Sequence, residues 1–212
     1  MVSQPASFYG NPKYSVPEPS SEVVRRQRLV DFLHQNIDQP LQLLCAPAGY
    51  GKTTLMADFA GDTDLTVCWY AVEELDRDPH SFAASLFEAV KTRFPALEEP
   101  GSSLTGQSQA AKLDWQTMVT GLTEGIRSRI PEYFAFVIDD FHIVSGVPEV
   151  LAALDQVFQH LPDNCRIILS TRELPGLASL PRLISQRKVA GIGPAELRFT
   201  ADEIKELLKI KI

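Results

Sequence analysis

Cysteine is scarce in this chain of 212 residues, and the three cysteines lie far apart. Cys45, Cys68 and Cys165 each stand within an apolar run, so we expect small buried side chains in a reducing compartment. Neither the cysteines nor the four histidines have the spacing of a zinc site, and no Gly-x-Ser-x-Gly elbow is present. The sequence therefore argues against a disulfide-stabilised secreted domain, a zinc module and an α/β-hydrolase.

Positive charge and long apolar runs are lacking as well. The formal net charge is -7, which argues against a surface built for duplex DNA, although Arg25, Arg26 and Arg28 form a short basic cluster. No apolar run approaches the roughly 20 residues that span a bilayer, and the polar, proline-rich N-terminus does not resemble a secretory signal. We therefore expect a cytoplasmic chain that neither contacts DNA directly nor enters a membrane.

Segments of strand character alternate with segments of helical spacing along most of the sequence. The expected strands share short runs of apolar residues: 41–45, 66–72, 134–138, 166–170 and 197–199. The expected helices share apolar positions three or four residues apart: 23–37, 54–60, a helix beginning at 79, 115–130, 150–161 and a helix opened by the capping box at 200–203. This alternation favours a parallel sheet covered by helices on both faces.

Residues 46–54, which read Ala-Pro-Ala-Gly-Tyr-Gly-Lys-Thr-Thr, have the pattern of a phosphate-binding loop. An expected strand precedes this run and an expected helix follows it, which is the context that such a loop requires. Ala46 stands where the usual pattern has glycine, and this is the single departure. The expected nucleotide-binding residues of the loop are Ala48, Gly49, Tyr50, Gly51, Lys52, Thr53 and Thr54.

The chemistry of this loop follows from its position at a helix start. Successive backbone N–H groups point into one concavity there, and the helix dipole favours an anion. Gly49 and Gly51 permit backbone angles and a close phosphate approach that a Cβ would hinder. Lys52 is expected to reach the β- and γ-phosphates, and the Thr53 hydroxyl is expected to bind Mg²⁺.

Polar residues end two further strands. The apolar strand 134–138 is followed by Asp139, which we expect to hold Mg²⁺ beside Thr53, and by Asp140, which we expect to orient an attacking water. Arg172 follows the strand 166–170 and is expected to sense the γ-phosphate through its guanidinium fork. Lys52, Asp140 and Arg172 are thus the expected catalytic residues.

These patterns predict the fold class and the domain limits. We expect a three-layer α/β P-loop NTPase of the ASCE type with a parallel central sheet. Along the chain, the separation of 87 residues from Lys52 to Asp139 leaves room for another strand between the two motif-bearing strands, and 66–72 is the candidate. Residues 1–22 are expected to form an extended N-terminal lead-in, and 23–199 the nucleotide-binding domain. Residues 95–110, rich in glycine, serine and proline, are expected to form an exposed loop. Residues 200–212 are expected to begin a truncated helical subdomain.

Three motifs together resemble the ATPase domain of MalT-like, LuxR-family large regulators, which belong to the signal-transduction ATPases with numerous domains (STAND). These are Pro47-Ala-Gly-Tyr-Gly-Lys-Thr-Thr-Leu55, Ile138-Asp-Asp-Phe-His142 and Ser170-Thr-Arg-Glu-Leu-Pro175. The segments 24–29, 69–82 and 196–200 agree with the same family, so the resemblance runs from about residue 22 to the C-terminus.

The resemblance implies ATP and ADP binding with Mg²⁺ in a slow regulatory switch. It implies that Val24, Arg25 and Arg26 contribute to the adenine pocket, and that the full-length protein self-associates in its ATP state. It also implies that sensor and effector domains, the effector usually a helix-turn-helix, follow the ATPase domain and are absent from these 212 residues.

Two other interpretations remain open at the level of sequence. A stand-alone P-loop ATPase or small-molecule kinase would share the loop, although an arginine-rich lid typical of such kinases is not apparent. A nucleotide held as a structural ligand, with negligible turnover, would also share it. Sequence does not separate slow hydrolysis from none, because hydrolysis depends on how water is positioned near Asp140.

Overall fold

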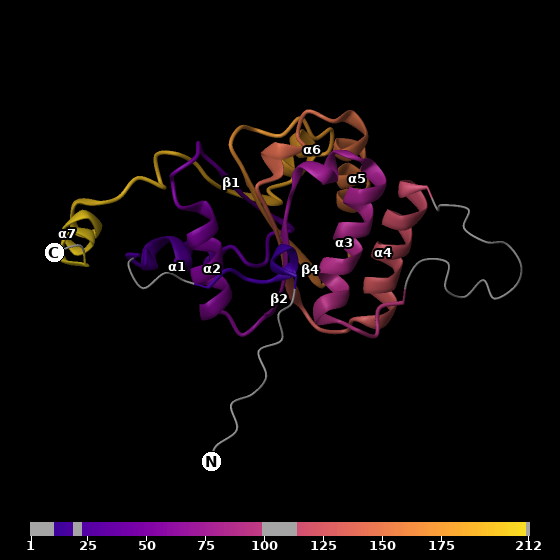
Figure 1. The fold of residues 1–212 in the computed structure, drawn as a ribbon, viewed down its shortest axis with the longest axis horizontal. Helices are drawn as coiled ribbons and strands as arrows, with labels where there is room; N and C mark the ends of the chain where they lie inside the picture. Colours follow the sequence, from indigo (N-terminus) through magenta and orange to yellow (C-terminus); the bar gives the residue numbers. More distant parts are fainter. Residues whose placement is uncertain (1–10, 19–22, 99–113, 211–212) are drawn as a thin grey trace, which may run out of the picture.

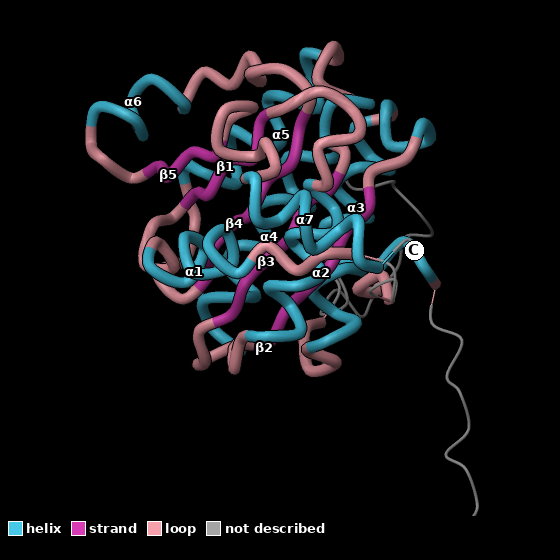
Figure 2. Tube along the Cα trace, turned by 90° about the vertical axis from the view of Figure 1, so that its left-hand side faces the viewer, coloured by secondary structure: helices cyan, strands magenta, loops and turns pink. Residues whose placement is uncertain are grey.

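Five parallel strands form the central layer of the structure, a computed structural model that describes residues 11–18, 23–98 and 114–210. The strands are β1 (Leu41–Cys45), β2 (Thr66–Ala71), β3 (Phe134–Asp139), β4 (Cys165–Thr171) and β5 (Val189–Ile192). Their order in the sheet is β2-β3-β4-β1-β5, and Figure 2 shows them side by side in this order. The carboxyl ends of β1, β4 and β3 therefore meet at one edge of the sheet.

Alternating side chains of the strands build two separate cores. Phe134 and Phe136 of β3 enter the core on one face, whereas Ala135 and Val137 enter the core on the other face. The same alternation in β2 sends Tyr70 to the first core and Trp69 to the second. Because both faces are buried, β1, β2, β3 and β4 read as largely apolar runs, and this explains why these four strands were predictable from sequence.

Helices cover both faces of the sheet, as Figure 1 shows. One face is covered by α1 (Gln27–Gln35) and α2 (Lys52–Asp62). The other face is covered by α3 (Pro79–Arg93), α4 (Trp115–Arg129) and α5 (Pro148–Gln159). The expected three-layer α/β fold with a parallel sheet is thereby confirmed.

Capping residues fix several helix starts where the sequence predicted them. Asp78 accepts a hydrogen bond from the Ser81 N–H at 2.8 Å, and Pro79 occupies the first helical position of α3. At the start of α7 (Ala201–Ile210), the Thr200 N–H donates to the Glu203 carboxylate at 2.8 Å, and the Glu203 N–H donates back to the Thr200 hydroxyl at 3.3 Å. This reciprocal pair is the predicted capping box.

The end of the sheet differs from the sequence-based expectation. Residues 197–199, expected as a strand, form a turn and bend, and the fifth strand is β5 instead. The short helix α6 (Leu180–Ser185) precedes β5 and was not predicted. The strand 66–72 lies between the two motif-bearing strands along the chain, as expected, and forms β2 at the edge of the sheet, whereas β4 lies between β1 and β3 in the sheet.

The lead-in also differs from the expected extended segment. Pro12–Tyr14 forms a turn of 3-10 helix, η1, which packs beside β2 and α3. Residues 1–10 and 19–22 lie outside the described residues.

The segment expected as an exposed loop, 95–110, differs at its start. Leu97 is buried in the core on the α3 and α4 face, whereas residues 99–110 lie outside the described residues.

Among the helices that the structure describes, none combines the length and apolar character needed to cross a bilayer.

Candidate functional site

A hollow of about 310 Å³ opens at the sheet edge where β1, β3 and β4 end. It is lined by the loop after β1 and by residues that follow β3 and β4: Ala48, Gly49, Gly51, Lys52, Thr53, Asp140 and Arg172. The fold thus brings together residues from three of the sequence motifs. Ala48 and Arg172, for example, are 124 residues apart in the sequence. This convergence makes the hollow the candidate functional site.

The loop adopts the backbone that its glycines allow. Gly49 has φ 84° and Gly51 has φ 69°, both in the left-handed region that favours glycine. Gly51 is the N-cap of α2, so α2 begins at Lys52, and Lys52 and Thr53 of its first turn line the hollow. A Cβ at Gly51 would lie 2.9 Å from Nη2 of Arg26, so the end of this arginine side chain would have to shift, and the positive φ already favours glycine. The expected anion site at a helix start is therefore present as geometry.

Lys52 folds back over the loop rather than pointing into solvent. Its Nζ donates to the Ala46 carbonyl at 2.6 Å and to the Pro47 carbonyl at 3.2 Å, and the side chain is mostly buried. Burial lowers the pKa of Lys52, while the nearby charges of Asp140 and Asp139 act in the opposite direction. The ammonium group is thus held against the loop by these two carbonyls. It is partly desolvated there, so a bound anion would stabilise its charge.

Asp139, at the end of β3, connects the loop to β4. Its Oδ2 accepts a hydrogen bond from the Thr53 hydroxyl at 2.7 Å, and its Oδ1 accepts from the Ser170 hydroxyl and from the Asp140 N–H at 2.9 Å. Burial raises the pKa of Asp139, and the bonds from Ser170 and Thr53 oppose this rise by stabilising the carboxylate. The two residues predicted to hold Mg²⁺ are therefore in direct contact.

Asp140 lines the opening of the hollow in a restricted conformation. It has φ 57°, which is uncommon for a residue other than glycine, and its N–H is held by Asp139 and by Ser170 Oγ at 3.0 Å. Its side chain is 48% exposed, so the carboxylate can reach water. Its Oδ1 lies 3.5 Å from Nδ1 of His142, whose pKa is lowered by burial and by the charge of Arg172.

Arg172 directly follows β4 and lines the hollow together with the loop residues. The turn that carries it is fixed by the Thr171 hydroxyl, which donates to the Glu173 carbonyl at 2.9 Å. No ion pair to Arg172 is found within the described residues, so the alternative of a simple surface pair with Glu173 gains no support. Tyr50 and Thr54 do not line the hollow, and Tyr50 packs instead against the core beneath α1 and α2.

The expected adenine residues of the lead-in have different surroundings from one another. Val24 is buried, and Arg25 is paired with Asp62 at the far end of α2, about 15 Å of helix away from the loop. Arg26 is only 3% exposed and donates to the carbonyls of Tyr50 at 3.1 Å, Gly51 at 2.6 Å and Leu197 at 3.0 Å. Arg26 therefore stabilises the loop through the carbonyls of Tyr50 and Gly51 without lining the hollow. The structure does not bring Arg25 to the hollow.

Sequence reasoning did not assign roles to Ser170 or to the loop contacts of Arg26. For Ser170 a signal existed, because a hydroxyl in an apolar strand beside the Asp139 strand needs a polar partner. For Arg26 no signal existed in its own segment, since its three acceptors are backbone carbonyls, one of them 171 residues away.

The chain is similar to curated regulators along nearly its whole length. It is 30% identical over 203 residues to the HTH-type transcriptional regulator MalT of Serratia proteamaculans and 28% identical to that of Cronobacter sakazakii. Each alignment covers 94% of this chain but 22% of the regulator, so the chain spans about a fifth of the length of these relatives. No family model matches the chain.

Solved structures with the same fold are P-loop ATPases. A STAND protein with a tetratricopeptide repeat sensor from Pyrococcus horikoshii matches with TM-score 0.61 and 20% identity, over 92% of this chain and 26% of its own. The Orc1 protein of Aeropyrum pernix matches with TM-score 0.55 and 18% identity, over 92% of this chain and 50% of its own. A Walker-type ATPase of Pyrococcus abyssi matches with TM-score 0.54 and 16% identity, over 91% of this chain and 59% of its own. The MalT similarity, the convergent motifs and the fold shared with the STAND protein together support a MalT-like STAND ATPase domain in this chain.

Proposed function

We propose that this chain binds ATP and ADP with Mg²⁺ in the hollow at the β1–α2 loop and acts as the nucleotide switch of a larger transcriptional regulator. The observation that carries the proposal is the convergence of the loop, Asp140 and Arg172 on one hollow of about 310 Å³. A hollow of this size is typical of a ligand pocket, which usually measures about 300–1,000 Å³. Its helix-start N–H groups, its lysine and its arginine favour a polyanion.

Each side chain of the hollow has a distinct proposed role. The loop N–H groups and Lys52 bind phosphate oxygens, with Lys52 exchanging the Ala46 and Pro47 carbonyls for the β- and γ-phosphates. Arg172 binds the γ-phosphate from the other side and thereby distinguishes ATP from ADP. Asp140, whose carboxylate reaches solvent, orients the water that attacks the γ-phosphate.

The residues present fit a magnesium ion. Mg²⁺ takes hard oxygen ligands and is usually held by one or two carboxylates together with substrate phosphates. Thr53 and Asp139 offer a hydroxyl and a carboxylate that already touch at 2.7 Å, and a larger cluster of acidic or histidine ligands is absent from the described residues. When bound, the ion would neutralise phosphate charge, and Ser170 would keep the Asp139 carboxylate oriented.

The switch role rests on similarity to a regulator and on the modest catalytic equipment of the hollow. We propose slow hydrolysis, because Asp140 is half exposed and Arg172 is the one arginine that lines the hollow within the described residues. In the full-length protein we propose that ATP favours self-association, and that DNA contact belongs to other parts of the polypeptide. A cytoplasmic location agrees with this role.

Calorimetry with ATP and ADP, each with and without Mg²⁺, tests the proposal on the 212-residue chain. We expect both nucleotides to bind, and we expect turnover in a coupled assay to be slow. Rapid hydrolysis, or transfer of the γ-phosphate to a small acceptor, would favour the alternative of a stand-alone ATPase or kinase. Absence of any nucleotide binding would contradict the proposed function.

Lys52→Ala is the variant that localises the site. Removal of the ammonium group should weaken ATP binding about 100-fold or more, because charge-assisted hydrogen bonds to phosphate contribute roughly 1.5–3 kcal/mol each. Lys209→Ala, which removes the same charge from the exposed face of α7, is the matched control and should bind ATP like the parent. Equal affinities of Lys52→Ala and the parent would show that nucleotide binds elsewhere.

A further inference from the structure

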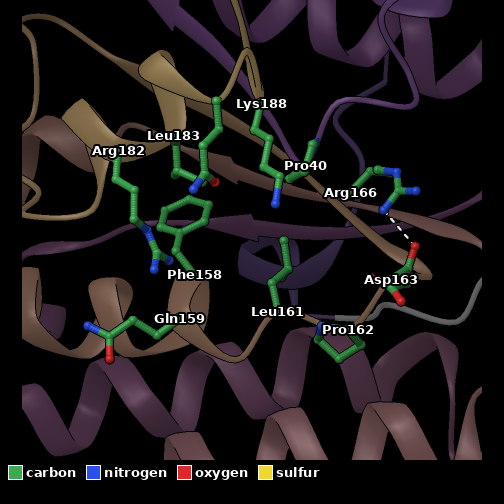
Figure 3. Close-up of a pocket in the computed structure, with 11 residues that line it drawn as sticks. Pro40, Phe158, Gln159, Leu161, Pro162, Asp163, Arg166, Arg182, Leu183 and Lys188 are labelled. Carbon is green, nitrogen blue, oxygen red and sulfur yellow. Dashed lines mark hydrogen bonds between the residues drawn. The ribbon is translucent and has the colours of Figure 1, made fainter.

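A second hollow lies at the opposite edge of the sheet from the candidate nucleotide site. Pro40 and Lys188 directly precede β1 and β5, and Arg166 is the second residue of β4, so the hollow opens where these strands begin. We call it the basic hollow and define it by Pro40, Phe158, Arg166, Arg182, Leu183 and Lys188. Figure 3 shows the Arg182 and Lys188 side chains extending into it.

The positive charges of the basic hollow have no carboxylate partners in the part of the chain that the structure describes. Arg166 donates to the backbone carbonyls of Asp163 at 2.6 Å and Cys165 at 3.3 Å, and its guanidinium lies 5.4 Å from the centre of the Tyr133 ring, so its partners carry no full negative charge. Arg182 and Lys188 make no side-chain hydrogen bond or ion pair within those residues. Asp163 is the single acid among the lining residues, so three cations face one anion in a chain of net charge -7.

Apolar side chains lie beneath the basic hollow, although polar groups form more of its lining than apolar groups do. Phe158, Pro162 and Leu183 are buried beneath it, and Leu161 is half-buried. A low-dielectric floor under charges of one sign concentrates the electrostatic field at the opening and raises the local concentration of counter-ions.

The size of the basic hollow limits what it can hold. Its volume is about 180 Å³, which is below the roughly 300 Å³ at which most ligand pockets begin. A more open hollow of about 350 Å³ adjoins it and shares Gln159 and Arg182. The room suits a ring or short chain with one charged head group, and it is too small for an enclosed nucleotide.

We propose that the basic hollow is a second ligand site, which binds a small organic anion with an apolar body. Arg182 and Lys188 bind the head group, a phosphate or a carboxylate, and the body lies on Phe158 and Leu183. The site is independent of the proposed nucleotide function, because its residues lie at the amino ends of the strands and none of them lines the other hollow. A ligand there would lie between α6, which carries Arg182 and Leu183, and the segment ends at which β1, β4 and β5 begin.

Phenyl phosphate and benzoate are suitable probes, since each joins a ring to one of the two head groups. We would titrate each into the ¹⁵N-labelled chain and follow the backbone amide signals by NMR. We expect saturable shifts at residues 158–166 and 182–188, and the tighter probe would identify the head group. Benzyl alcohol has the ring without the charge and should produce no such shifts, and inorganic phosphate should bind more weakly than phenyl phosphate.

The double variant Arg182→Gln and Lys188→Gln tests the two cations. We expect the affinity for the better probe to fall about tenfold or more, as the loss of charge-assisted hydrogen bonds requires. Arg187→Gln is the matched control, because Arg187 is exposed, lies next to Lys188 and does not line the basic hollow. Retention of the parent NMR spectrum elsewhere would show that each variant is folded.

Three results would overturn the proposal. One is a set of shifts confined to amides 48–53, which would mean that the probes bind the nucleotide loop alone. Another is an equal loss of affinity in Arg187→Gln and in the double variant, which would mean diffuse charge attraction. The third is equal binding of benzyl alcohol, which would mean an apolar surface without an anion site.

Discussion

At the scale of single residues, the charge of Asp139 depends on the donors around it. The carboxylate is buried, so its ionised form relies on the hydroxyls of Thr53 and Ser170 and on the Asp140 N–H. Burial raises the pKa of Asp139, so ionisation of this carboxyl group lowers the free energy of unfolding. This loss begins once the pH exceeds the pKa that Asp139 has in the unfolded chain. Stability contributed by the protonated form is thus lost as the pH rises.

Replacement of Ser170 by alanine should expose this dependence. The free energy of unfolding should fall by about 1–3 kcal/mol at pH 7, because a buried carboxylate loses a hydrogen bond. Since the missing bond raises the folded-state pKa further, the loss should be larger at pH 7 than at pH 4. Urea unfolding at both pH values measures it, with Ser128→Ala, whose hydroxyl bonds an exposed helix carbonyl, as the control.

Asp140→Asn separates binding from turnover. The amide retains the size of the side chain but cannot orient a water as a carboxylate does, so ATP should still bind while turnover falls about 100-fold. A phosphate-release assay alongside calorimetry checks both parts. Asp64→Asn, a substitution at an exposed acid before β2, is the control. Turnover at the parent rate in Asp140→Asn would remove the proposed role of Asp140.

At the scale of elements, two arginines at the start of α1 form hydrogen bonds with segments that are distant in sequence. Arg26 bonds the loop carbonyls and the Leu197 carbonyl, and Arg28 bonds the carbonyls of Glu196 at 2.7 Å and Arg198 at 2.7 Å. The Arg28 Nε also lies 2.9 Å from the Glu203 carboxylate, so α1 holds the start of α7. The nucleotide loop and the segment leading to α7 thus share one support.

Arg26→Gln should weaken the connections of Arg26 to both of these segments. The buried guanidinium satisfies three carbonyls, so its loss should lower the free energy of unfolding by about 2–4 kcal/mol and, through a less ordered loop, the affinity for ADP about tenfold. Urea unfolding and calorimetry measure the two effects. The control is Arg25→Gln, which removes a neighbouring charge from a surface pair with Asp62. If both variants bound ADP equally, the loop would not depend on Arg26.

Sequence predicted the elements whose signal is contained in their own residues. The buried strands and the helix starting at Asp78-Pro79 carry such signals, and they were confirmed. The strand β5 has four residues with a glycine among them, so its place in the sheet comes from pairing with β1 rather than from propensity. The apolar Leu197 and Phe199 resembled a strand, but Leu197 is buried as part of a turn that bonds Arg26.

The candidate site was predictable to a similar degree. Lys52, Thr53, Asp140 and Arg172 could be predicted to meet because parallel strands deliver their carboxyl ends to one edge. The support from Arg26 and the bond from Ser170 to Asp139 depend on tertiary placement, which no local pattern encodes. The basic hollow is of the same kind, because its three cations come from separate elements.

At the scale of the whole molecule, the two proposed ligand sites lie at opposite ends of the strands. The proposed nucleotide site lies where β1, β3 and β4 end, and the basic hollow opens where β1, β4 and β5 begin. The strands β1 and β4 run between the two hollows, and both are buried on two faces. Figure 1 shows α7 beyond α1 and away from the sheet, and none of its residues is buried. The rigid centre and the outlying helix therefore differ in how freely they can respond to a ligand.

The lead-in is joined to this centre by a buried ion pair. The Lys13 Nζ lies 2.8 Å from the Asp76 carboxylate, and the side chains are 10% and 0% exposed. Asp76 also accepts from the Glu73 N–H and from the Ser85 hydroxyl, while the Tyr14 hydroxyl contacts Ser85 at 3.3 Å. These contacts attach η1 to the edge of the sheet and to α3, so part of the expected lead-in 1–22 packs with the domain expected at 23–199.

Lys13→Ala measures how much this attachment contributes to the stability of the whole chain. Removal of one partner leaves the buried Asp76 charge uncompensated, so the free energy of unfolding should fall by about 3 kcal/mol, and added salt should change this loss little. The control is Lys205→Ala, which breaks an ion pair to Asp202 of similar length, 2.9 Å, whose side chains are exposed, and which should not lower stability measurably. Urea unfolding at low and high salt compares the two. If Lys13→Ala proved as stable as Lys205→Ala, the lead-in would contribute little to the fold, and the predicted boundary between residues 22 and 23 would describe the molecule better than the contacts of η1 do.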